Sequence, residues 1–331
     1  MEYSKRKFVI IAVIALVCLG LLLALILNLD NIFNGEGFFS GISATESQKK
    51  LQTVYIDNVP YLPRKEVVNF LVMGLDEEGY AEGEGRAQVD FLLLISFNKE
   101  DQTYKMYQID RDTMAEVDTY NNRGEKIGTK TEQIALSYAY GDNKTISNPQ
   151  KANNTIKSVS KLFYGLKIHH YVAITMSGTA ELVDALGGIN IVVKDDMTAI
   201  NELFVHGEEV MLDGKLALQY IRARGGLDVP TNIARMARQR DFLSVVIEKL
   251  ASTELDTGNA LSIYSSIEEY TFTGCDDDCF SELFGYLNDY SSLGIVSLEG
   301  ESVRGEKFME FYIDENVMKG LVTNVFFEKA K

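Results

Sequence analysis

The sequence predicts an α/β fold, a three-layer α-β-α sandwich with a central mixed sheet that is preceded by one N-terminal transmembrane helix. Three observations lead to this prediction: an uncharged run of twenty residues near the N-terminus, short apolar segments typical of strands covered on both faces, and helical segments that alternate with them. The chain has 331 residues, 46% of them hydrophobic and 24% charged, so it is long enough to bury a large core.

The uncharged run FVIIAVIALVCLGLLLALIL occupies residues 8–27. As a helix it spans about 30 Å, the thickness of the apolar core of a bilayer. The basic residues 5–7 precede it and predict a cytoplasmic N-terminus, whereas a cleaved signal peptide would have a shorter apolar run and a small-residue cleavage site. We expect a cytoplasmic segment at residues 1–7, a transmembrane helix at 8–28, and an extracellular location for all that follows.

An extracellular stalk is expected at residues 29–66 and a catalytic domain at residues 67–328. Within them, short apolar runs predict strands, and amphipathic segments with start and stop signals predict helices. The predicted strands are Thr53–Ile56, Asn69–Leu75, Phe91–Phe97, Tyr104–Asp110, Tyr171–Thr175, Ile189–Val193, Gly294–Leu298 and Phe308–Ile313. The predicted helices are residues 148–165, stopped by Gly165; 179–188, stopped by Gly187 and Gly188; 232–250, capped by Thr231 or Asn232; and 314–327, which begin with an acid.

Composition excludes several classes of protein. The chain has 48 Asp and Glu against 32 Lys and Arg, a formal net charge of −16, so it lacks the basic footprint of a nucleic-acid binder. Three Cys and three His are too few for a disulfide scaffold and argue against His-based metal chemistry. The sequence CDDDC at residues 275–279 is open to several interpretations, a disulfide, a metal loop or two free thiols, and we favour an exposed acidic loop.

Against this acidic background, residues 220–240 hold five arginines and one acid. If YIRAR is extended, Arg222 and Arg224 leave the same face. The guanidinium fork matches phosphate, and a helix N-terminus attracts anions, so the stretch predicts a phosphate site. The alternative is a solvated basic face with local ion pairs.

The helix that follows carries the other three arginines of this stretch. Arg235 and Arg238 lie about 60° apart around the predicted helix and flank its buried stripe. Arg240 lies about 140° from Arg235, and we expect it at the surface.

Acids stand at the ends of neighbouring predicted strands. Asp76 follows one strand, Asp90 precedes the next, and Arg111 and Asp112 follow a third. Loops at strand ends bind ligands in open α/β sheets, and Mg²⁺ prefers a few carboxylates together with phosphate oxygens. Asp76 and Asp90 are equally compatible with ordinary turn and cap positions.

Taken in order, these pieces resemble the LytR-CpsA-Psr family of Gram-positive envelope enzymes. The matching motifs are MGLD, GRAQVD for Gly-Arg-Ser-Asp, IDRDT for Ile-Pro-Arg-Asp-Thr, EQIALSYAYG, VDALGGINIVV, LDGKLALQYIRAR and NIARMARQR. The resemblance covers roughly residues 67–250 closely and the tail more loosely. It implies a membrane-anchored phosphotransferase that moves an anionic or capsular glycopolymer from a polyprenyl-pyrophosphate carrier onto peptidoglycan, with Mg²⁺ or Mn²⁺ as cofactor.

The resemblance also implies roles for individual residues. Asp76 and Asp90 would bind the metal, and the catalytic set would be Asp90, Arg111 and Asp112. Asp112 would position Arg111 or act near the attacking hydroxyl. The residues expected to bind pyrophosphate are Arg86, Arg111, Arg222, Arg224, Arg235, Arg238 and Gln239.

The chain departs from the family pattern in two places. Gln88 stands where the family has Arg, two residues before Asp90, so either Arg86 supplies that charge or the site lacks it. Asn232 stands where the family has an acid, which argues against a base at that position. The alternative function is a non-catalytic or regulatory protein of the attenuator type that holds polyprenyl phosphate or wall polymer. However, only seven residues precede the apolar run, too few for a DNA-binding domain.

The expected topology is testable on whole cells. Protease added to intact protoplasts should remove the domain that follows the apolar run, because the basic residues 5–7 hold the N-terminus inside. The cleavage is followed by immunoblotting of a C-terminal tag, with a cytoplasmic protein as the control for sealed membranes. A domain that stays protected while that control is protected would contradict the topology.

Overall fold

The computed structural model describes residues 53–76, 87–121, 123–141, 149–223, 232–252, 262–263, 265–275, 279, 282–283, 286 and 289–330. No helix within this part of the chain is long and apolar enough to cross a membrane. The transmembrane helix expected at 8–28 and the cytoplasmic segment at 1–7 lie outside the described residues.

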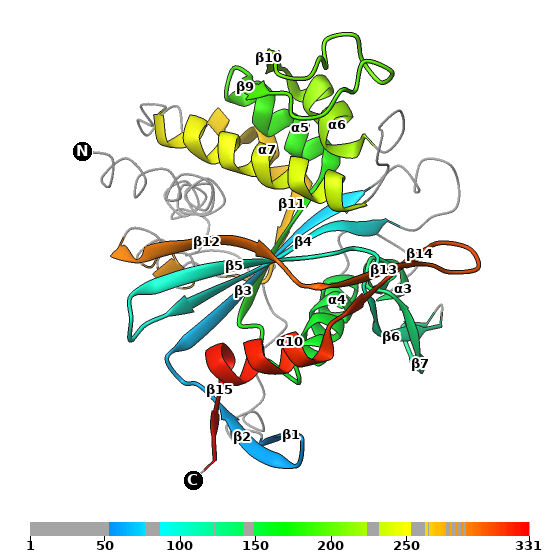
Figure 1. Ribbon diagram of the computed structural model, residues 1–331, viewed down its shortest axis with the longest axis vertical. Helices are drawn as coiled ribbons and strands as arrows, with labels where there is room; N and C mark the ends of the chain where they lie inside the picture. Colours follow the sequence, from blue (N-terminus) through cyan, green and yellow to red (C-terminus); the bar gives the residue numbers. More distant parts are fainter. Residues whose placement is uncertain are drawn as a thin grey trace, which may run out of the picture.

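A six-stranded mixed sheet forms the centre of the domain, which confirms a mixed α/β fold (Figure 1). The strand order is β11-β8-β3-β4-β5-β12, in which β3 pairs parallel with β8 and β5 pairs parallel with β12, while the other neighbours are antiparallel. The strands are β3 (Val67–Asp76), β4 (Gln88–Asn98), β5 (Thr103–Ile109), β8 (His170–Thr175), β11 (Thr271–Thr273) and β12 (Ser291–Ser297).

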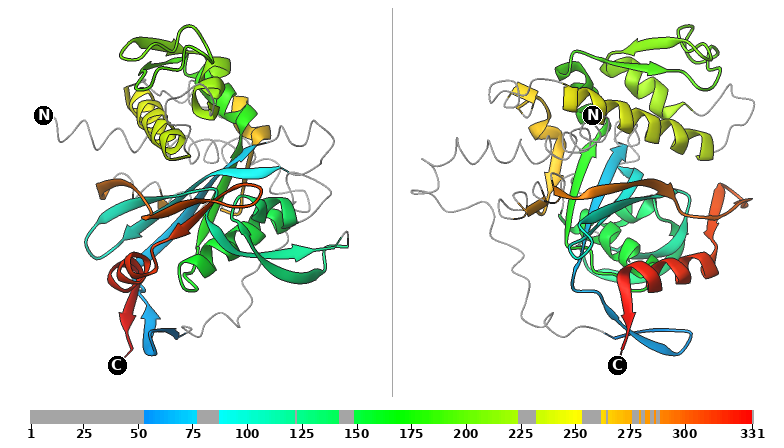
Figure 2. Two further views of the ribbon diagram at one scale, coloured as in Figure 1. Left: turned by 45° about the vertical axis from the view of Figure 1, so that its right-hand side comes forward. Right: turned by 60° about the vertical axis from the view of Figure 1, so that its left-hand side comes forward.

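Both faces of this sheet are covered, as the continuous apolar runs predict. Alternate side chains of β3 belong to different cores: Leu71 and Met73 lie in one, and Val68 and Phe70 lie in the other. The first core is closed by the helices α3 (Leu136–Gly141), α4 (Pro149–Leu162) and α10 (Glu315–Leu321). Figure 2 shows α4 and α10 on one side of the sheet and α7 on the other.

A further core lies under α7 (Asn232–Ser252), beyond the end of β8. It is built from α5 (Met176–Ala185), α6 (Gly214–Arg222) and the antiparallel pair β9 (Ile189–Val192) and β10 (Glu209–Leu212). The helices and strands around this core place the last turn of α6 and the first turn of α7 above the ends of the central strands. The remaining elements are the hairpins β6 (Met114–Tyr120) with β7 (Lys126–Gln133) and β13 (Gly300–Arg304) with β14 (Met309–Ile313), and the short helices η2 (Glu268–Tyr270) and η3 (Val322–Phe326).

The ends of the described chain meet in a small three-stranded sheet. It consists of β1 (Val54–Ile56), β2 (Val59–Pro63) and β15 (Phe327–Lys329), with β2 in the middle. Ile56 is buried in the core below the central sheet. Residues 54–63 are therefore part of the folded unit, although they were expected in the stalk, because their apolar side chains pack against the C-terminal strand.

Two local predictions were wrong. The segment expected to be extended at Tyr220–Arg222 is the last turn of α6, because Asp213 caps that helix by accepting the N–H of Leu216 at 2.8 Å, and the buried Ala217 and Tyr220 recur at helical spacing.

The cysteines of CDDDC do not lie in an exposed loop. Cys275 and Cys279 are joined by a disulfide. Both are buried, because they pack against the apolar face of the central sheet. The three aspartates between them lie outside the described residues.

His169 gives the fold a measurable dependence on pH. Burial, together with the positive charge of Lys167, lowers its pKa to about 3, and its Nδ1 accepts the N–H of Asn69 at 3.0 Å. A lowered pKa in the folded state means that only the unfolded chain takes up this proton between about pH 6.5 and 3. We expect the stabilisation to be complete above pH 6.5 and to fall, by at most about 1.4 kcal/mol per pH unit, as the pH drops through this range.

Denaturant unfolding of the wild type and of His169→Gln, at intervals between pH 7 and 4, measures this contribution. The glutamine keeps an acceptor for Asn69 but does not titrate, so its unfolding free energy should fall less steeply with pH. Parallel curves for the two proteins would show that His169 is not the group responsible.

Candidate functional site

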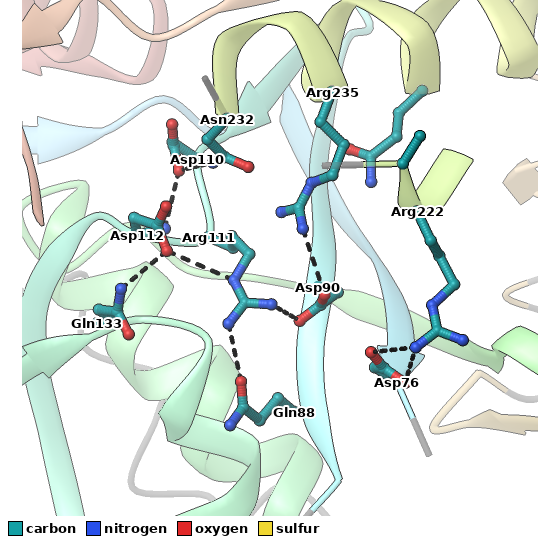
Figure 3. A network of polar contacts seen from close by, with 12 residues as sticks. Asp76, Gln88, Asp90, Asp110, Arg111, Asp112, Gln133, Arg222, Asn232 and Arg235 are labelled. Atoms are coloured by element: carbon teal, nitrogen blue, oxygen red, sulfur yellow. Dashed lines mark hydrogen bonds and ion pairs between the residues drawn. The ribbon is translucent and has the colours of Figure 1, made fainter. Parts of the chain in front are cut away.

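Strand pairing brings the sequence-predicted acids and arginines to one edge of the central sheet. Antiparallel pairing of β3 with β4 sets Asp76 opposite Gln88, and pairing of β4 with β5 sets Leu92 opposite Ile109. The end of β3, the start of β4 and the end of β5 therefore lie together, with the first turn of α7 and the last turn of α6 above them (Figure 3).

Arg111 is the centre of the contacts at this edge. Its Nη1 donates to Asp90 Oδ1, its Nη2 donates to Gln88 Oε1 at 2.8 Å, and its Nε lies 3.5 Å from Asp112 Oδ1. Asp112 is held in turn by Gln133, whose Nε2 donates to Asp112 Oδ1 at 2.8 Å. The guanidinium plane of Arg111 is thus fixed by partners from β4 and from its own turn.

Asp90 lies inside β4 rather than before it, and its carboxylate sits between two guanidinium groups. Besides Arg111, it meets Arg235, whose Nη1 is 3.6 Å from Asp90 Oδ2. The side chains of Asp90 and Arg235 are only 5% and 3% exposed, so this pair interacts in a medium of low polarity. A buried carboxylate held in this way keeps both arginines in place at the edge.

The pair of Asp76 and Arg222 forms a more open part of the same edge. Arg222 Nη2 lies 3.3 Å from Asp76 Oδ2, and the two side chains are 28% and 20% exposed. In the described part of the chain, no group of three or more His, Cys, Asp or Glu converges here. Asp76 and Asp90, the two carboxylates expected to bind Mg²⁺, both lie at this edge, and each of them faces a guanidinium group.

Two predicted residues of α7 point elsewhere. Arg238 is buried and donates to Asp195 Oδ2 at 2.9 Å and to the carbonyl of Ala223. Gln239 accepts from Gln108 Nε2 at 3.3 Å. The structure does not bring Arg238 or Gln239 into the network around Arg111.

Arg240 was expected at the surface, and this expectation was wrong. It is half-buried and donates to Gln108 Oε1 and to Ser297 Oγ, both at 2.7 Å, because β5 and β12 pass beneath the helix at this point. Two further predicted phosphate ligands, Arg86 and Arg224, lie outside the described residues.

Other polar residues joined the site without being predicted. Gln133 comes from the end of β7, far along the chain from any arginine motif. Asp110 is buried at the end of β5, where it accepts from the backbone N–H of Asp112 at 2.8 Å and from Asn232 Nδ2. The signal for Asp110 was present in IDRDT, where a second acid stands immediately before the arginine.

Two adjoining pockets open beside this network. The smaller, of about 350 Å³, is lined by Arg111, Asp112, Arg235 and Asn232, among others, and is the place where an anion would meet the guanidinium groups. The larger, of about 690 Å³, is lined by Asp110, Arg240 and several residues of the β13–β14 region. Ile233 lies between them and lines both.

Curated relatives match most of the chain. The polyisoprenyl-teichoic acid–peptidoglycan teichoic acid transferase TagU of Bacillus mycoides (strain KBAB4) is 27% identical over 266 residues, 80% of this chain and 79% of the relative. The TagU of Oceanobacillus iheyensis (strain DSM 14371) is 26% identical over 267 residues, 80% of this chain and 75% of the relative.

Solved structures share the fold. The protein Lin1025 of Listeria innocua aligns with a TM-score of 0.52 at 25% identity, over 78% of this chain and 96% of the other. B. subtilis TagT aligns with a TM-score of 0.55 at 20% identity, over 79% and 90% of the two chains. The sequence profile of the LytR_cpsA_psr family matches residues 39–326. This chain belongs to the LytR_cpsA_psr family.

Proposed function

We propose that this protein is a membrane-anchored, Mg²⁺-dependent transferase that moves an anionic glycopolymer from a polyprenyl-pyrophosphate carrier onto peptidoglycan. The observation that carries the proposal is the network of Arg111, Arg235 and Asp90, whose two arginines line a pocket of about 350 Å³. The curated relatives named above are teichoic acid–peptidoglycan transferases, and TagT has been solved bound to LIIa-WTA. The proposed location is the outer face of the cell membrane in a Gram-positive-type envelope.

In this proposal the arginines bind the two phosphates of the donor. Arg111 is already oriented by Asp90, Gln88 and Asp112, so little reorganisation is needed when charge develops on the phosphate oxygens. Arg235 and Arg222 are each paired with an acid in the fold. A bound Mg²⁺ would neutralise the carboxylates that now face these arginines. The guanidinium groups could then bind the phosphate oxygens of the donor.

The metal-binding acids can be tested by isosteric changes. Asp76→Asn and Asp90→Asn should each reduce transfer of a lipid-pyrophosphate-linked glycan by on the order of 10²-fold, because the site loses charge needed to hold the cation. Binding of Mn²⁺, followed by electron paramagnetic resonance, should weaken in both variants. Asp195→Asn, which alters the partner of Arg238, is the matched control and should keep both properties; unchanged Mn²⁺ binding in the first two variants would remove these acids from a metal site.

The arginines are not equivalent, and their alanine variants should separate. Arg222→Ala and Arg235→Ala should each weaken binding of geranylgeranyl pyrophosphate by roughly 10- to 150-fold, since each loses charge-assisted bonds of about 1.5–3 kcal/mol. Lysine at either position should rescue binding only partly, because a point charge cannot form a bidentate contact. Binding is compared at fixed salt and saturating Mg²⁺.

Two other arginines of α7 serve as controls. Arg240→Ala should change binding less than threefold, and Arg238→Ala should mainly lower the free energy of unfolding, by about 2 kcal/mol, through loss of its bonds to Asp195 and Ala223. Equal small losses of binding at all four positions would indicate a diffuse basic surface instead of a pyrophosphate site.

A further inference from the structure

Asp110 is a buried carboxyl group to which the proposed donor site assigns no role. It follows the last residue of β5, is 3% exposed, and lines the 690 Å³ pocket directly beside the pocket of the arginines. Asp90, by contrast, lies in direct contact with two guanidinium groups, and Asp112 with one. Asp110 forms no ion pair with any residue that the structure describes.

The hydrogen bonds of Asp110 fix one of its oxygens. The N–H of Asp112 and Nδ2 of Asn232 both donate to Oδ1. Oδ2 accepts no hydrogen bond from the described residues, and Figure 3 shows it pointing away from Asp112. The carboxyl group is therefore oriented by one atom and has the other available to a molecule in the pocket.

The environment of Asp110 strengthens it as a proton acceptor. Burial raises its pKa and the charge of Asp112 adds to this, while the bonds from Asp112 and Asn232 and the charge of Arg235 act in the opposite direction. The other charged groups lining the same pocket are Arg240, Glu299, Glu301 and Asp314. A raised pKa brings a carboxylate closer to the range in which it removes a proton efficiently near neutral pH.

The larger pocket suits a carbohydrate more than a phosphate. Glu299, Glu301 and Asp314 offer carboxylate oxygens to sugar hydroxyls, and Phe311 and Tyr312 offer ring surface to sugar C–H groups. The same acids repel a phosphorylated polymer, which the arginines of the neighbouring pocket attract. Charge thus separates a place for an uncharged glycan acceptor from a place for the anionic donor.

We propose that Asp110 is the general base of the transfer and that the 690 Å³ pocket holds the glycan acceptor. This inference rests on the transferase function proposed above. The acceptor hydroxyl oxygen forms a bond to the phosphorus that carries the glycopolymer, the bond from that phosphorus to the polyprenyl phosphate breaks, and the hydroxyl proton passes to Oδ2 of Asp110. Polyprenyl phosphate leaves with the electron pair of the broken bond.

The central experiment compares Asp110→Asn with the wild type as full-length proteins in detergent. Asparagine keeps the shape and an acceptor for Asn232 but cannot take the proton. Transfer from a lipid-pyrophosphate disaccharide to peptidoglycan strands should fall at least 100-fold, while binding of geranylgeranyl pyrophosphate should stay within threefold of the wild type. The acid limb of the pH profile of kcat/KM should disappear from the remaining activity.

Two further variants guard against a structural explanation. Asp118 is another buried carboxyl group; it lies in β6 and forms ion pairs with Lys126 and Lys161. Asp118→Asn should leave transfer unchanged. The double variant Asp110→Asn with Asn232→Asp moves the acid across the hydrogen bond. Its rate of transfer should be at least tenfold higher than that of Asp110→Asn alone.

The outcomes separate this inference from the proposed function. Transfer by Asp110→Asn within threefold of the wild type would overturn the role of Asp110, as would parallel losses of donor binding and transfer. If the wild type itself neither binds the pyrophosphate probe nor transfers the glycan, the proposed function fails, and the inference about Asp110 fails with it.

Discussion

The ion pair between Arg111 and Asp90 is the interaction on which the rest of the site depends. A carboxylate with almost no exposure is stable only where cations or donors replace its lost hydration. Asp90 obtains this from Arg111 and Arg235, and Arg111 in turn binds Gln88 and Asp112. One buried charge therefore ties β4, the turn after β5 and the start of α7 together, and any ligand at this edge meets groups whose positions are already set.

Much of the fold could be predicted because its signals are local. The apolar runs of β3, β4 and β5 are continuous, and each strand lies within a few residues of its predicted position. Asp314 caps α10 as its acid suggested, and Gly165 has the positive φ expected of a helix stop. The helical end of α6 was missed because two arginines spaced by one residue fit an extended segment, and the cap at Asp213 lies seven residues before Tyr220.

The sequence predicts which residues reach the site only where their positions at strand ends or at the starts of helices determine it. Asp76, Asp90, Arg111, Arg222 and Arg235 gather at one edge, as the order of the elements indicates. Helical angles alone did not show that Arg238 would face Asp195 or that Arg240 would reach Gln108, since both partners come from elements distant in sequence. Asp110 was overlooked because the family pattern drew attention to its neighbours Arg111 and Asp112.

The small sheet of β1, β2 and β15 has a consequence for handling the protein. Both ends of the described chain finish in this sheet, at the end of the molecule away from α5, α6 and the β9–β10 pair (Figure 1). A reporter domain or affinity handle fused after β15 would emerge next to the N-terminal strand, and no residue of β1, β2 or β15 lines either of the two pockets described above. The same adjacency makes the domain suitable for circular permutation, with a short linker joining the outer strands and new termini opened between β6 and β7, beside the exposed residues Arg123 and Glu125.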